Sequence, residues 1–181
     1  LNLPHDWSIS GPFSEGPGSG TYAHLPSGLG WYRKHFVVPA AFQDGKVVVE
    51  FDGVYQNSEV WLNGHYLGKR PYGYISFAYD LSPYLHFGGN NLIAVKVDNS
   101  RQPNCRWYSG SGIYRHTWLL VTNRLHVAYW GTTVTTPEVS AASALVQVKT
   151  RVANEGAAVS HIQLVTTLLN RQGELVLTAK A

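Results

Sequence analysis

The dipeptide Asn63–Gly64 is the feature that most limits what this chain can fold into. It lies between two short segments rich in apolar residues, Ser58–Leu62 and His65–Gly68. An Asn-Gly pair favours a type I′ turn, because both central residues of that turn need a positive φ. The sequence therefore predicts a β-hairpin at this point, and with it an antiparallel sheet.

Further segments of strand length follow one another up to residue 121. In one of them Val47, Val49 and Phe51 share a face, because side chains on a strand alternate between its two sides. Glycines and prolines, 18 and 9 in 181 residues, separate these segments. About seven short strands joined by such turns are typical of a β-sandwich, so we expect an all-β fold. The other expected strands cover residues 30–38, 75–79, 91–98 and 113–121.

The composition changes beyond residue 121, where Val, Thr and Ala replace most of the aromatic residues. Four strands are expected at 125–135, 144–153, 159–169 and 174–179, and the alternation around Val146 and Val148 predicts one buried sheet face. Four strands are fewer than an immunoglobulin-like sandwich needs. We therefore expect a first domain at 1–122 and a second at 123–181 that is truncated, or that covers its open edge with another chain.

Several classes of function are not expected. The net charge of +3 comes from basic residues scattered singly or in pairs, which is unlike a nucleic-acid-binding stripe. There is no apolar run of about 18 residues, so no membrane span is expected. The eight histidines lack metal-ligand spacing, and we expect neither a metal nor a cofactor. The carboxylates fit solvated strand faces and turns, so no catalytic residue is expected in this chain.

The loop before the last strand of the first domain is the strongest candidate for contact with a ligand. It carries Asn104, Arg106, Trp107 and Tyr108. A sugar offers apolar C–H faces that pack on aromatic rings, and hydroxyls that Asn, Asp and Arg can bind. We therefore predict a carbohydrate contact here, with packing at the edge of the core as the alternative for Trp107 and Tyr108.

Two further tryptophans, Trp61 and Trp118, lie on predicted strands, and we expect both to pack in the core.

A series of motifs, in order along the chain, resembles glycoside hydrolase family 2, which contains β-galactosidases, β-glucuronidases and β-mannosidases. The motifs are Leu3–Trp7, Gly30–Lys34, Phe51–Val54, Trp61–Gly64, Asp80–Leu85, Asn91–Val95 and Trp107–Arg115. The resemblance implies a jelly-roll sugar-binding domain followed by the start of an immunoglobulin-like domain. It also implies that the catalytic glutamates lie in a later (β/α)8 barrel, for which this chain is too short.

The resemblance implies that loops of the jelly roll contribute to the sugar site. The residues expected to contact substrate are Asp6, Trp7, Asn104, Arg106, Trp107 and Tyr108. In the β-galactosidase branch of the family, an acidic residue stands five positions before the Ser-Gly-Ile segment. Arg106 occupies that position here, which weakens a galactose assignment and leaves an acidic sugar as an alternative.

The sequence thus predicts the non-catalytic N-terminal segment of a β-galactosidase-like retaining glycosidase. Its expected partners are a β-linked carbohydrate and the rest of the parent polypeptide; a homo-oligomer is left open. The alternatives are a self-standing carbohydrate-binding or adhesive β-sandwich, and a structural spacer. The chain has no Met and its first residues are not a signal peptide, which predicts an excised fragment, with a periplasmic or secreted location favoured over a cytoplasmic one.

Overall fold

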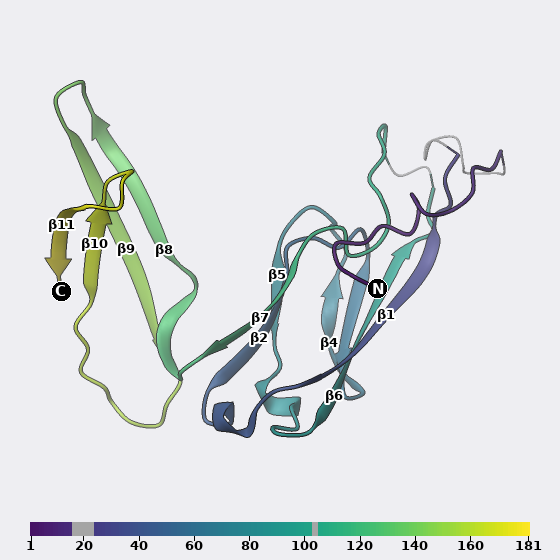
Figure 1. Ribbon diagram of the computed structural model, residues 1–181, viewed down its shortest axis with the longest axis horizontal. Helices are drawn as coiled ribbons and strands as arrows, with labels where there is room; N and C mark the ends of the chain where they lie inside the picture. The colour runs from purple at the N-terminus through teal and green to yellow at the C-terminus, as the bar shows by residue number, and fades with distance from the viewer. Residues whose placement is uncertain (16–23, 103–104) are drawn as a thin grey trace. The chain divides into compact units, whose positions relative to one another are not determined.

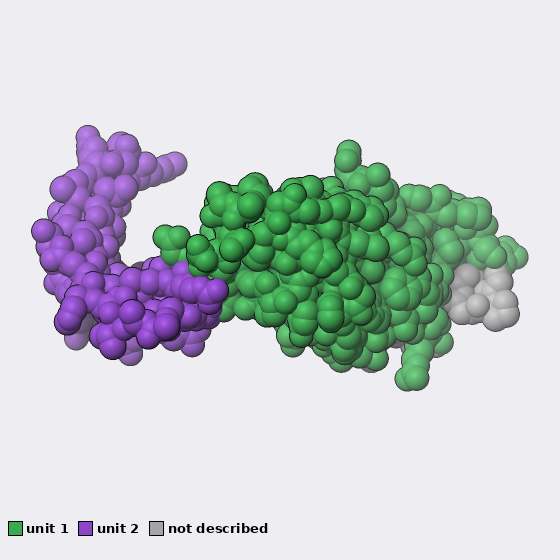
Figure 2. All heavy atoms as spheres, turned by 90° about the horizontal axis from the view of Figure 1, so that it is seen from below, with its two compact units in different colours: residues 1–123 green, residues 124–181 purple. Residues whose placement is uncertain are grey.

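The computed structural model describes residues 1–15, 24–102 and 105–181. These residues form two compact units, Leu1–Asn123 and Arg124–Ala181, which are coloured separately in Figure 2. Apart from two short 3-10 helices, the regular structure of these described residues is β-strand (Figure 1). The all-β prediction is confirmed.

Unit 1 is a sandwich of two antiparallel sheets. One sheet has the order β1-β6-β3-β4, with bounds Gly28–Val37, Asn90–Asn99, Ser58–Leu62 and His65–Arg70. The other has the order β5-β2-β7, with bounds Phe77–Asp80, Lys46–Phe51 and Thr117–Thr122. The 3-10 helices η2 (Ala40–Phe42) and η3 (Ser82–Tyr84) lie in the connections.

The core of unit 1 is built from the inward-facing residues of both sheets, as the alternation predicted. In β2 the residues Val47, Val49 and Phe51 are buried, whereas their neighbours are partly exposed. Phe51 is 1% exposed and stacks on Phe77 of β5, with ring centroids 5.1 Å apart. Val60 and Leu62 of the facing sheet belong to the same apolar cluster. The two sheets are therefore held together mainly by apolar burial.

The predicted hairpin is present between β3 and β4. Asn63 and Gly64 have φ values of 49° and 84°, both positive as a type I′ turn requires. The Asn63 side chain also accepts a hydrogen bond from the Leu92 N–H at 2.9 Å, which ties the turn to β6.

The expectation that Trp61 and Trp118 pack in the core is wrong. Trp61 lies on the outer face of β3, half-buried between Trp31 and Tyr66, at centroid distances of 5.3 and 5.4 Å. Trp118 is 50% exposed, and its indole N–H donates to the Asp52 carboxylate at 3.1 Å. The residues that flank each tryptophan and face the other way are smaller: Val60 and Leu62 in β3, and Thr117 and Leu119 in β7 (Thr117–Thr122). The two indoles therefore lie on the outer faces of the sheets.

Unit 2 consists of two antiparallel ladders. In one, β8 (Leu125–Val139) pairs with β9 (Ala144–Asn154); in the other, β10 (Val165–Leu169) pairs with β11 (Leu175–Lys180). The strand expected at 159–169 begins only at Val165. No residue of unit 2 is buried, and Val146 and Val148 are 39% and 36% exposed. The predicted buried face is therefore wrong, because neither two-stranded ladder has a second sheet packed against it.

The stacked pair at the centre of unit 1 gives the first prediction. Phe51→Ala should lower the free energy of unfolding of unit 1 by about 3–5 kcal/mol, since it removes a buried ring and leaves a cavity. Phe42→Ala is the matched control: Phe42 is 43% exposed, and the change should cost about 0.5 kcal/mol or less. Urea unfolding followed by tryptophan fluorescence measures both; equal losses would contradict the assignment of the core.

Candidate functional site

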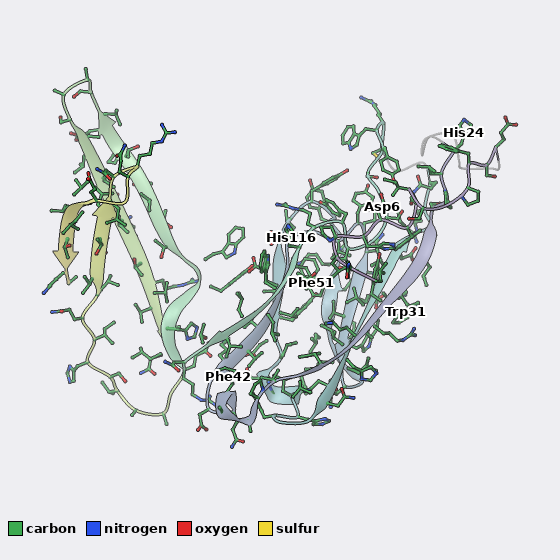
Figure 3. The ribbon with its side chains drawn as sticks, viewed as in Figure 1. Asp6, His24, Trp31, Phe42, Phe51 and His116 are labelled. Carbon is green, nitrogen blue, oxygen red and sulfur yellow. The ribbon has the colours of Figure 1, made fainter. Side chains whose placement is uncertain are left out.

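The candidate site is formed where the N-terminal segment meets the described parts of the connection between β6 and β7, residues 100–102 and 105–116 (Figure 1); we call this connection the β6–β7 loop. The backbone N–H groups of His5 and Trp7 donate to the carbonyls of Ile113 and Ser111 at 2.8 and 3.0 Å. Figure 3 labels Asp6 at this end of the sandwich. Two segments about a hundred residues apart in sequence are thus paired like adjacent strands.

Buried polar side chains fix the base of the loop. Asn99, the last residue of β6, donates through Nδ2 to the Gly110 carbonyl at 3.1 Å and to Ser111 Oγ at 2.8 Å. Ser8 Oγ donates to the same Ser111 oxygen at 2.7 Å. Ser8, Asn99 and Ser111 are all 0% exposed, so these bonds replace water that the groups have lost. The C-terminal part of the loop is therefore rigidly anchored.

The Asp6 carboxylate is occupied by donors of the protein itself. Its Oδ1 accepts from the N–H groups of Ser8 and Ser111, both at 2.9 Å, and its Oδ2 accepts from the Tyr108 hydroxyl at 2.5 Å. Gly110 permits this approach, because a Cβ at that position would lie 2.7 Å from Asp6 Oδ2. Asp6 therefore connects the N-terminal segment to the β6–β7 loop.

Trp7 packs against the core of unit 1. It is partly buried against the apolar core, at a centroid distance of 6.3 Å from Tyr32. A Cβ on Gly30 would lie 2.6 Å from its ring, so the indole sits directly on the backbone of β1. Most of this ring is used for packing rather than for ligand contact.

Exposed aromatic side chains gather at the outer part of the loop. Trp107 is 60% exposed and donates through its indole N–H to the Tyr74 hydroxyl at 3.0 Å. Tyr74 also lies 5.6 Å from Tyr72, and both belong to the connection between β4 and β5. We call Tyr72, Tyr74, Trp107 and Tyr108 the aromatic wall. Exposed rings held by hydrogen bonds are suited to packing on a sugar.

Of the residues predicted to contact substrate, the structure brings Asp6, Trp7 and Tyr108 together around Ser111 and Gly110. Arg106 is exposed and directly precedes Trp107. Asn104 lies outside the described residues. Tyr72 and Tyr74 were missed by sequence reasoning, although two tyrosines in the Pro71–Ile75 turn region, where no strand face needs them, are a usable signal.

Burial or local hydrogen bonds shift the pKa of three groups in this part of unit 1, Tyr32, Asp98 and Tyr114. Burial raises the pKa of Tyr32 and of Tyr114, whose hydroxyl donates to the Gly73 carbonyl at 2.9 Å. At the start of the loop, hydrogen bonds from the Ser100 hydroxyl and N–H lower the pKa of Asp98. A general acid for glycoside hydrolysis needs a carboxyl group with a raised pKa, which is the opposite of the shift at Asp98.

Among the described residues, no group of three or more His, Cys, Asp or Glu side chains could hold a metal ion, and no helix is long and apolar enough to cross a membrane. A cavity of about 820 Å³ lies between the sheets beside β1 and β7. Its lining includes the core residues Val49, Phe51 and Ile113 and the N-terminal residues Leu1–Leu3, but no member of the aromatic wall. The Ile113 carbonyl also accepts the His5 N–H, so the cavity borders the candidate site.

Comparison with known proteins identifies a family. A sequence model described as "Glycosyl hydrolases family 2, sugar binding domain" matches residues 21–123. A β-galactosidase of Bacteroides ovatus is 51% identical over 178 residues, which is 97% of this chain and 21% of that protein. A putative β-glucuronidase of Formosa agariphila is 51% identical over 128 residues, 70% of this chain and 12% of that protein.

Solved structures agree with the sequence matches. A family 2 member from Bacteroides cellulosilyticus superposes with a TM-score of 0.90 at 43% identity, covering 100% of this chain and 24% of that one. A β-glycosidase from Bacteroides vulgatus gives 0.92 at 44% identity, covering 99% and 23%. The chain thus spans about a fifth to a quarter of the length of the Bacteroides relatives, and its match to the Formosa agariphila protein covers 12% of that protein.

The contact between Asp6 and Gly110 gives a prediction with an internal control. Gly64 and Gly110 both have positive φ, but only at Gly110 would a Cβ meet a neighbouring atom. Gly64→Ala should cost about 1–2 kcal/mol of unfolding free energy from backbone strain. Gly110→Ala should cost roughly 1–3 kcal/mol more, because it also displaces the Asp6 carboxylate from its donors.

The same pair of substitutions in an Asp6→Ala background separates the two causes. There the difference between the alanine variants should largely disappear, as measured by chemical denaturation. If the full difference persists without the carboxylate, the close contact with Asp6 is not its cause.

Proposed function

This chain belongs to glycosyl hydrolase family 2, and from that premise we propose that it is a non-catalytic part of a larger retaining β-glycosidase. Unit 1 (with residues 1–122 as its jelly-roll domain) supports a catalytic barrel carried by the rest of the polypeptide and lines part of its sugar site. Residues 123–181 form part of an immunoglobulin-like domain, which other segments of the parent protein complete. The proposal leaves open whether the parent protein forms a homo-oligomer.

One observation carries the proposal: the aromatic wall is exposed within the family's sugar-binding domain, and its members Trp107 and Tyr108 lie with Arg106 on a loop whose C-terminal part is anchored by buried hydrogen bonds. A loop with a rigid base can present side chains to a ligand at little entropic cost. The indole of Trp107 offers a flat apolar surface for the C–H face of a sugar. Arg106 adds donors for hydroxyl or carboxylate oxygens.

The substrate we propose is a β-linked galactoside. The Bacteroides ovatus β-galactosidase supports this choice, because its similarity extends over 97% of the chain. A glycoside of an acidic sugar is the second candidate. Arg106 supports it, since a guanidinium can bind a carboxylate through two parallel hydrogen bonds, and so do relatives named as β-glucuronidases.

Trp107 is the residue that tests the sugar contact. In the parent polypeptide, Trp107→Ala should raise KM for a matching nitrophenyl β-glycoside about tenfold, the equivalent of ~1.4 kcal/mol of stacking, with little change in kcat. Trp118→Ala is the matched control, because that indole is also about half exposed and also donates its N–H to a side-chain oxygen. Equal effects of the two changes would argue against a specific role for Trp107.

The alternative of a self-standing carbohydrate-binding module makes a different prediction. If the proposal holds, residues 1–181 alone should hydrolyse no β-glycoside and should bind monosaccharides more weakly than micromolar, because the barrel supplies the catalytic carboxylates and the rest of the pocket. Isothermal titration with galactose and with glucuronate measures this. A micromolar dissociation constant for either sugar would favour the self-standing module.

A further inference from the structure

We propose that Asp6 is a positioning residue: it does not bind the sugar but holds Tyr108, and through it the aromatic wall, in the arrangement that the sugar meets. The inference rests on the proposed function of the wall as a sugar contact. It replaces the sequence-based expectation that Asp6 itself touches substrate.

The hydrogen bonds of Asp6 carry the first step. A carboxylate has about four acceptor positions. Three of them are used by the N–H groups of Ser8 and Ser111 and by the Tyr108 hydroxyl. One acceptor position remains, but all three bonds that Asp6 makes hold parts of the protein itself, and from this geometry we assign Asp6 to the loop rather than to the sugar. A charged acceptor with several donors is held more firmly than a neutral one.

The second step is the place of Tyr108 in the loop. Ser111 and Gly110, on one side of it, are fixed by the buried Asn99. Trp107, on the other side, is held through its N–H by Tyr74. Tyr108 is 40% exposed, so apolar burial alone holds its ring only in part. The hydroxyl–carboxylate bond therefore supplies an attachment between two fixed points of the loop.

The third step is energetic. An exposed aromatic side chain that is ordered before the sugar arrives does not lose that freedom on binding. Each such side chain is worth roughly 2- to 10-fold in affinity. Loss of the Asp6 attachment should therefore weaken substrate binding and leave the chemical step nearly unchanged, because the catalytic groups lie elsewhere in the parent protein.

The test uses the parent polypeptide and three variants. Tyr108→Phe keeps the ring and removes the hydroxyl that bonds to Asp6, so KM should rise roughly 2- to 10-fold with kcat within about twofold. Asp6→Ala should raise KM at least as much. Asp6→Asn keeps an acceptor for the Ser8 and Ser111 N–H groups and should lie between the wild type and Asp6→Ala.

The double variant separates positioning from direct contact. If Asp6 acts through Tyr108, Asp6→Asn combined with Tyr108→Phe should have about the KM of the worse single variant. If the KM of the double variant instead rises by the product of the two single-variant fold-changes, Asp6 acts on the substrate itself and the proposal is overturned. A large loss of kcat in Asp6→Asn alone would overturn it in the same way.

A second readout does not depend on activity. Trypsin cleaves after exposed arginines, and Arg106 lies two residues before Tyr108. Tyr108→Phe and Asp6→Asn should speed cleavage after Arg106 several-fold, whereas cleavage after Arg171, in the turn between β10 and β11, should stay unchanged. Unchanged cleavage at Arg106 would overturn the positioning role. An unchanged KM in Trp107→Ala would instead contradict the proposed sugar contact, with the cleavage result still deciding the role of Asp6.

Discussion

The buried hydrogen bonds among Ser8, Asn99 and Ser111 are what the candidate site depends on. All three side chains are closed off from water, and each would cost about 1–3 kcal/mol if left without a partner. They satisfy one another only when the N-terminal segment, the end of β6 and the β6–β7 loop meet. This requirement fixes the loop more strictly than apolar packing would, because hydrogen bonds demand both distance and direction. Trp107 and Tyr108 can therefore be exposed to solvent while the buried residues Ser8, Asn99 and Ser111 fix the base of their loop.

Much of the fold of unit 1 could be predicted from local patterns. The Asn63–Gly64 turn and the alternation in β2 each express a rule that acts over a few residues. The same alternation does not tell which face meets another sheet. For this reason Trp61 and Trp118 were placed in the core although they cover its outside, and Val146 was expected on a buried face that nothing covers. Which face of a strand is covered depends on packing between segments far apart in sequence, and a local pattern of residues does not specify that packing.

The candidate site divides in the same way. The loop with Arg106 and Trp107 could be found from sequence, since basic and aromatic residues between small ones are visible locally. Tyr74, which reaches Trp107 from a connection 33 residues earlier, could not be assigned to the same surface. Nor could the direction of the Asp6 carboxylate be foreseen, because its partner Tyr108 is 102 residues away in the chain. Residue type indicated a polar contact with a ligand; the geometry indicates a contact within the protein.

The lack of any buried residue in unit 2 has a consequence for the cooperativity of the chain. Unit 1 has a closed apolar core, whereas the two ladders of unit 2 have only backbone pairing and cross-strand contacts to hold them. Two-stranded ladders of this kind are marginal in water. The chain by itself therefore has no single unfolding transition that describes both units, and its amide hydrogens should fall into two classes, slowly exchanging in the sandwich and rapidly exchanging in the ladders.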